Sequence, residues 1–64
     1  MKNNILSIRE SKGISQVELG EQANISRWYM NKIENNKVHL GLVLASRIAY
    51  VLECSVQEIF FTTN

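Results

Sequence analysis

The chain has 64 residues, a formal net charge of +1 and a single cysteine. This length allows one small domain, which we expect to span residues 1–64 and to bury only about 60% of the surface that the unfolded chain exposes. One cysteine, Cys54, and one histidine, His39, exclude an intramolecular disulfide and supply too few ligands for a tetrahedral zinc site. No metal or other cofactor is therefore expected, and packed helices or a partner subunit must supply the stability.

The N-terminal residues are polar, and no apolar run approaches the roughly 18 residues that cross a bilayer. We therefore expect neither a signal peptide nor a membrane anchor. A lone thiol suits a reducing compartment, so the sequence predicts a cytoplasmic protein.

The spacing of the apolar residues predicts an all-α domain, a compact bundle of five short helices. Apolar residues recur at intervals of three and four rather than two, and the chain contains no proline. We expect the first helix at about residues 4–12, with Ile5 and Ile8 facing inward. Gly13 is placed to close it, because glycine readily adopts the left-handed backbone conformation.

The second and third helices are each preceded by a serine. Ser15 begins an S-x-x-E capping box at the start of the second helix, residues 16–23. Asn24 tolerates a positive φ and predicts a tight turn, after which Ser26 caps the third helix, residues 27–35. The side chains that we expect to be buried are Val17, Leu19 and Ala23 on the second helix and Met30 and Ile33 on the third.

The fourth helix, residues 41–53, is the most apolar segment and should lie at the centre of the bundle. Its apolar residues are Leu42, Leu44, Ala45, Ile48, Ala49, Val51 and Leu52. Ser55 and Glu58 repeat the capping box and begin a last short helix at residues 56–60.

The segment SQVELGEQANISRWYMNKIEN, residues 15–35, has the pattern of two helices that cross steeply through a short turn. Gly20 allows the two helices to approach closely, and Asn24 makes the turn. Three apolar residues would hold the third helix against the second: Ile25, Met30 and Ile33. No one position is specific, but five in register predict a helix-turn-helix formed by the second and third helices.

With these motifs the chain resembles helix-turn-helix proteins of the Cro/CI repressor family, also called the Xre family. The resemblance extends from Ile5 to Phe60 and rests on I-R-E-S-K-G-I-S-Q at 8–16, K-I-E-N at 32–35 and A-x-x-L-E-C-S-V-Q-E-I-F at 49–60. It implies a five-helix, lambda-repressor-like domain that regulates transcription by binding double-stranded operator DNA, usually as a dimer.

The resemblance also implies roles for individual residues. The family's base-reading positions fall on Arg27, Trp28, Asn31 and Lys32. Side chains on the outer, N-terminal part of such a helix are those that reach base edges in a major groove about 12 Å wide. Contacts with the DNA backbone are implied for Gln16, Asn35, Asn36 and Lys37. Arg9 and Glu34 match a pair that joins the first helix to the end of the third by an ion pair.

A net charge of +1 is low for a DNA-binding domain. Residues 27–37, however, contain three lysines or arginines against one carboxylate, so a local positive patch is expected if they share a face. Two positions depart from the family's pattern. Asn36 stands where glycine is frequent, and the residues 39–41 replace a segment that usually contains proline.

We therefore expect a repressor that binds an inverted-repeat operator as a homodimer, since one helix reads too few base pairs for adequate specificity. The expected dimer contacts are the apolar residues Ile59, Phe60 and Phe61. The alternative is a protein-interaction module, antagonist-like or antitoxin-like, that keeps the fold and binds a protein through Trp28 and Tyr29. No phosphate-binding loop, paired carboxylates or nucleophile–base pair is evident, so neither an enzyme nor a small-molecule ligand is expected.

Overall fold

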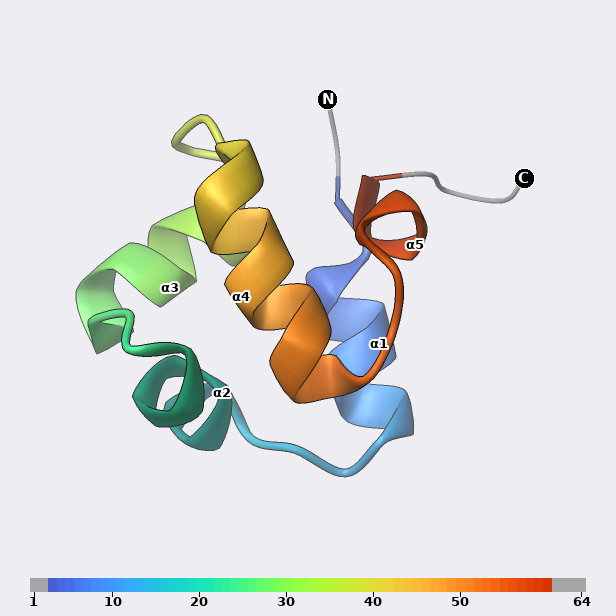
Figure 1. The fold of residues 1–64 in the computed structure, drawn as a ribbon. Helices are drawn as coiled ribbons and strands as arrows, with labels where there is room; N and C mark the ends of the chain where they lie inside the picture. The colour runs from blue at the N-terminus through green and yellow to red at the C-terminus, as the bar shows by residue number, and fades with distance from the viewer. Residues whose placement is uncertain (1–2, 61–64) are drawn as a thin grey trace.

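The computed structural model describes residues 3–60, and this part of the chain forms five helices and no strand (Figure 1). The helices are α1 (Ile5–Ser11), α2 (Gln16–Ala23), α3 (Arg27–Glu34), α4 (Leu42–Leu52) and α5 (Val56–Phe60). The predicted all-α fold is confirmed, and every observed helix end lies within one residue of the predicted one.

Capping boxes mark the starts of α2 and α5. The Ser15 Oγ accepts from the Glu18 backbone N–H at 3.0 Å, and Glu18 Oε1 accepts from the Ser15 N–H at 2.9 Å. Ser55 and Glu58 form the same capping box before α5, at 3.1 and 2.9 Å. The hydrogen bonds with Ser55 lower the pKa of the Glu58 carboxyl below its ordinary value. Both predicted capping boxes are therefore present. Each provides side-chain acceptors for two backbone N–H groups at a helix start.

The chain turns between helices through residues with positive φ. Gly13 (φ 70°) follows α1, and Asn24 (φ 59°) follows α2. Glu53 closes α4 with a φ of 56°. Glycine and asparagine tolerate this conformation, whereas glutamate adopts it seldom, so the sequence indicated the first two turns and not the third.

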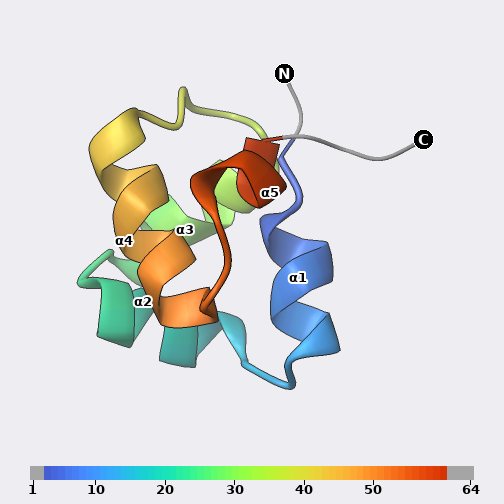
Figure 2. The same ribbon diagram turned by 45° about the vertical axis from the view of Figure 1, so that its right-hand side comes forward.

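α4 lies at the centre of the fold, as predicted. It packs against α2 on one side and α5 on the other, and Figure 1 shows it between the α2–α3 pair and the α1–α5 pair. In Figure 2, α1 and α5 lie together to the right of α4. The buried core contains Ile5, Leu19, Ala23, Ile25, Met30, Ile33, Leu40, Ala45, Ile48, Ala49, Leu52 and Ile59.

Two apolar side chains of α2 and α4 are exposed, and one of them, Val17, was expected in the core. Leu42 is 69% exposed and Val17 is 40% exposed. Leu42 lies in the first turn of α4, at the edge of the stripe formed by Ala45, Ile48, Ala49 and Leu52, where no neighbouring helix covers it. Val17 projects from the side of α2 that faces away from its buried residues. Hydrophobicity alone therefore mispredicted the burial of Val17.

The contrast between Leu52 and Leu42 gives a stability prediction on one helix. Leu52 is 0% exposed and Leu42 is 69% exposed. Leu52→Ala should lower the free energy of unfolding by about 2–5 kcal/mol, because it removes buried methyl groups and leaves a cavity. Leu42→Ala should change it by about 0.5 kcal/mol or less. Urea unfolding followed by circular dichroism measures both, and equal effects would contradict this description of the core.

Candidate nucleic-acid interface

The angle between α2 and α3 is set by a close backbone contact at Gly20. The Ile25 N–H donates to the Gly20 carbonyl at 2.8 Å. A Cβ atom at residue 20 would lie 2.9 Å from the Ile25 carbonyl oxygen, closer than real Cβ contacts, so a larger residue would push the turn away. Buried Met30 and Ile33 then seat α3 against the core. The predicted helix-turn-helix is therefore present.

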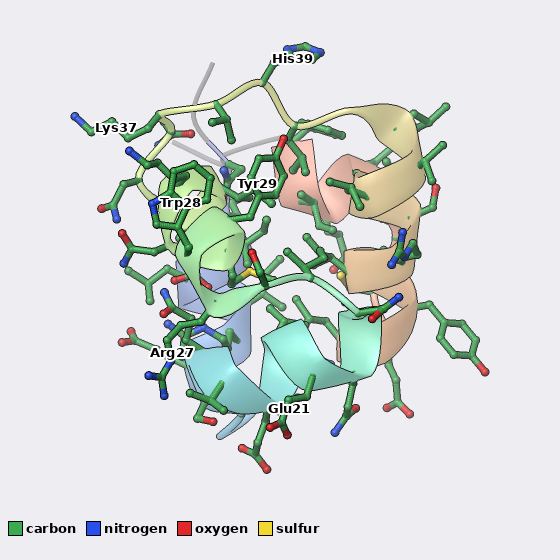
Figure 3. All side chains as sticks on the ribbon, turned by 90° about the vertical axis from the view of Figure 1, so that its left-hand side faces the viewer. Glu21, Arg27, Trp28, Tyr29, Lys37 and His39 are labelled. Atoms are coloured by element: carbon green, nitrogen blue, oxygen red, sulfur yellow. The ribbon has the colours of Figure 1, made fainter. Side chains whose placement is uncertain are left out.

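The outer face of α3 is open. Ser26 caps the helix by accepting from the Tyr29 N–H at 3.1 Å. Of the four residues that we expected to read bases, Lys32 is half-buried and the other three are exposed: Arg27, Trp28 and Asn31. Arg27, Trp28 and Lys37 project from the side of the molecule that is farther from α4 (Figure 3). None of the four candidate reading residues is packed in the core.

Two aromatic rings and one ammonium group are grouped on α3. Trp28 is 66% exposed, and Lys32 Nζ lies 5.1 Å from the centroid of its ring. Tyr29 is half-buried against the core, and its ring centroid lies 6.3 Å from that of Trp28 with an interplanar angle of 32°. The indole ring is thus in contact with a cation and with an aromatic ring that is anchored in the core.

Three residues that we expected at the DNA backbone follow directly after the last turn of α3. Asn35, Asn36 and Lys37 are all exposed. The Asn35 Nδ2 donates to the Asn31 carbonyl at 2.9 Å and to Asn31 Oδ1 at 3.3 Å. Asn36 has a φ of 57°, and its Oδ1 accepts from Asn3 Nδ2 at 3.2 Å. Asn36 therefore adopts the left-handed conformation that the family's glycine would allow.

Arg9 and Glu34 form a partly buried ion pair between α1 and α3. The Arg9 Nε lies 2.8 Å from Glu34 Oε2, and its Nη2 donates to Glu34 Oε1 at 3.1 Å. The side chains are only 11% and 5% exposed. Arg9 Nη1 also donates to the Ile14 carbonyl at 3.1 Å. The hydrogen bond with Glu34 is the main reason that the pKa of Arg9 is raised.

Gln16, which we expected at a DNA phosphate, belongs to the same network. It is the first residue of α2, and its Nε2 donates to Glu34 Oε1 at 3.1 Å. An amide nitrogen has two N–H groups, so one of them is left for an outside acceptor. The network thus links α1, α2 and α3 at the start of the helix-turn-helix.

Sequence reasoning missed one residue that supports this region. Arg47 of α4 donates from Nε to the Ala23 carbonyl at 3.1 Å and from Nη2 to the Asn24 carbonyl at 3.0 Å. These carbonyls end α2, and a cation there is favourable for the helix dipole. Arg47 is the only charged residue within Leu42–Leu52, which is the signal that could have found it.

The structure corrects the expected dimer surface. Ile59 is 0% exposed and belongs to the monomer core, because α5 packs against α4. It is therefore unavailable to a partner subunit. Phe60 is half-buried and packs against the core, and Phe61 lies outside the described residues.

Within residues 3–60, no helix is long and apolar enough to cross a membrane. The same part of the chain contains no group of three or more His, Cys, Asp and Glu side chains that could hold a metal ion. Cys54 is a free, half-buried thiol, and burial raises its pKa.

The Arg9–Glu34 pair predicts a difference between single and double variants. Arg9→Met leaves the partly buried Glu34 carboxylate without its cation and should cost up to about 3 kcal/mol, the lower end of the range for a fully buried pair. Arg9→Met combined with Glu34→Leu removes both charges and should recover much of that loss. The free energy of unfolding in urea measures both variants. A double variant no more stable than Arg9→Met would show that the charge of Glu34 is not the cause.

Comparison with known proteins places this geometry in a family. The helix-turn-helix family model HTH_3 matches residues 5–59. A structure of the restriction-modification controller protein C.AhdI from Aeromonas hydrophila is similar, with 26% identity and a TM-score of 0.84, covering 89% of this chain and 86% of that chain. No curated protein sequence matches.

Two further solved structures are similar. SinR from Bacillus subtilis, a master regulator for biofilm formation solved in complex with DNA, has 31% identity and a TM-score of 0.79, covering 84% of this chain and 87% of that chain. The clp gene regulator ClgR from Corynebacterium glutamicum has 26% identity and a TM-score of 0.81, covering 84% of this chain and 57% of ClgR. Because the family model covers nearly all of the described residues, this chain belongs to the helix-turn-helix family HTH_3, of the Cro/CI or Xre type.

Proposed function

We propose that this chain is a cytoplasmic transcription repressor that binds an inverted-repeat operator in double-stranded DNA as a homodimer. The observation that carries the proposal is the outer face of α3, where Arg27, Trp28 and Asn31 are exposed. The opposite face of α3 is fixed by buried Met30 and Ile33. A helix that is anchored on one side and polar on the other can enter a major groove without rearranging.

The similar structures support a role in regulation through DNA. SinR was solved in complex with DNA, C.AhdI is a restriction-modification controller and ClgR is a gene regulator. We extend DNA binding and transcription regulation from these proteins to this chain. The same relatives support a binding function rather than catalysis.

Arg27 and Asn31 have the chemistry to read bases. The Arg27 guanidinium presents a fork that matches guanine O6 and N7, and an asparagine amide matches adenine N6 and N7. The Asn31 Oδ1 already accepts from Asn35 Nδ2 at 3.3 Å. A carbonyl oxygen has a second lone pair, so Asn31 can still accept from an adenine amino group.

The expected backbone contacts lie on both sides of these reading residues. Gln16 begins α2, and Asn35, Asn36 and Lys37 follow α3. Contacts with phosphates from the two sides would fix the orientation of α3 in the groove without adding sequence preference. Lys37 supplies the charge that makes such binding sensitive to salt.

The length of the reading helix supports a homodimer. α3 has eight residues and is about 12 Å long, so it spans only a few base pairs. Two copies on half-sites about 34 Å apart would double the number of bases read. Ile59 is buried and cannot contact a second copy. At this end of the molecule we therefore expect the half-buried Phe60 to contribute to the dimer contact.

Selection from a random pool of duplex DNA tests the proposal. We expect an inverted repeat whose half-sites are about 10 base pairs apart, with an affinity that falls steeply as salt rises. Direct repeats or single half-sites would contradict the dimer. Failure to retain any duplex at low salt would contradict DNA binding itself.

One observation favours a second candidate function. Trp28 is 66% exposed beside Tyr29, and such a pair suits a protein partner. An antagonist-like or antitoxin-like module would keep the fold and use this surface for a protein. A salt-independent failure to bind any duplex, with the folded state intact, would favour this alternative.

Arg27 and Lys37 should behave differently when they are replaced. Arg27→Ala should weaken binding by about 1–3 kcal/mol and relax the preference at one base position, because a base-edge contact is lost. Lys37→Ala should weaken binding to all sequences about equally and reduce the salt slope by about one unit, because a phosphate contact is lost. Titration of selected and scrambled duplexes at several salt concentrations separates the two. Equal losses on all duplexes for Arg27→Ala would remove Arg27 from the reading set.

A further inference from the structure

Trp28 and Lys32 lie one helical turn apart on the same face of α3. The Lys32 Nζ is 5.1 Å from the centroid of the indole ring, within the roughly 6 Å over which a cation is attracted to an aromatic face. Residues four apart on a helix are neighbours, so this contact needs no distortion of the backbone.

The surroundings of the pair favour this contact. Among residues 3–60, the only salt bridge is that between Arg9 and Glu34. Within this part of the chain, Lys32 therefore has no carboxylate partner that would draw it away from the ring. The Trp28 ring is itself held beside Tyr29, which packs against the core. Tyr29 therefore contacts the core and Trp28, and Trp28 in turn contacts the Lys32 ammonium.

This arrangement matters for recognition because a lysine side chain is flexible. Fixing it on a base edge costs up to about 2 kcal/mol of rotamer entropy. If the Trp28 ring already restrains the Lys32 ammonium in the free protein, less rotamer entropy is lost when DNA binds. This is preorganisation. Trp28 is still 66% exposed with Lys32 in place, so part of the indole remains open to a second, apolar contact.

We propose that Trp28 is a positioning residue for Lys32 and that the pair selects a thymine adjacent to a guanine in the operator. In the major groove the thymine methyl is the apolar group, and guanine offers two acceptors, O6 and N7. Adjacent bases are separated by about 3.4 Å along the strand, so a ring and an ammonium side by side can face neighbouring bases. This inference rests on the proposed function and names the bases that one part of the site reads.

A double-mutant cycle tests the coupling, using a fluorescent duplex enriched from the random pool. Lys32→Ala should weaken binding of the original protein about tenfold, the middle of the range for a base contact. In a Trp28→Leu background, which keeps an apolar side chain and removes the ring, Lys32→Ala should weaken binding much less. Trp28→Phe keeps a ring and should restore the effect of Lys32→Ala.

Base preference supplies a readout that a merely structural role would not change. Repeating the selection with Lys32→Ala should relax the guanine position. Trp28→Leu should relax that same guanine position as well as the adjacent thymine position, and both variants should leave the other positions unchanged. Tyr50→Leu is the matched control, because it removes an aromatic side chain that is 86% exposed on α4. It should leave the affinity and every base preference as they were. Thermal melting checks that each variant is folded.

A measurement on the free protein separates this inference from DNA binding. The ring current of Trp28 should move the Lys32 side-chain methylene protons upfield in the NMR spectrum, and Trp28→Leu should abolish the shift. Absence of the shift, or independent effects of the two substitutions on DNA affinity, overturns the pair while DNA binding stands. Loss of binding to every duplex by the original protein overturns the proposed function and the base selection together.

Discussion

The fold depends most on the contact between the backbones of Gly20 and Ile25. With the Ile25 N–H on the Gly20 carbonyl at 2.8 Å and no room for a Cβ between them, α2 and α3 cross at one distance and one angle. That crossing turns Met30 and Ile33 inward and leaves Arg27 and its neighbours outward. Arg47 reinforces it from α4 by binding the last carbonyls of α2. The presentation of α3 to a groove is therefore a consequence of close packing on its other side.

The second determinant is electrostatic. Burying Arg9 and Glu34 has a desolvation cost, which close hydrogen bonding offsets, and such pairs contribute geometry more reliably than stability. The Glu34 carboxylate also accepts a hydrogen bond from the Gln16 amide, so this one carboxylate links α1, α2 and α3. Arg9 compensates the negative charge of Glu34, so this carboxylate does not cancel the positive charges of Arg27, Lys32 and Lys37. A chain with a net charge of +1 can thus present a positive face, because the distribution of charge matters more than its sum.

The sequence was informative where structure is decided locally. Capping serines, Gly13 and Asn24 act through hydrogen bonds and φ values within a few residues, so the helix ends could be predicted from them. Burial depends on which distant element covers a side chain, and apolar character does not reveal this. Val17 was expected inside and is exposed, whereas Ile59 was expected at an interface and is buried. The Arg47 contacts also depend on long-range packing, because they join α4 to the end of α2. The candidate reading residues were placed by the resemblance to the Cro/CI family, and their accessibility came only from the structure.

The central claim is that the outer face of α3 is the surface that meets DNA. The most direct test is an NMR titration of the folded protein with duplex DNA, following backbone amides and the Trp28 indole N–H. The account predicts that the largest shifts occur at Arg27, Trp28 and Asn31 and at the start of α2. Shifts concentrated instead at Leu42, Val43 and Tyr50, the exposed apolar side chains of α4, would contradict it.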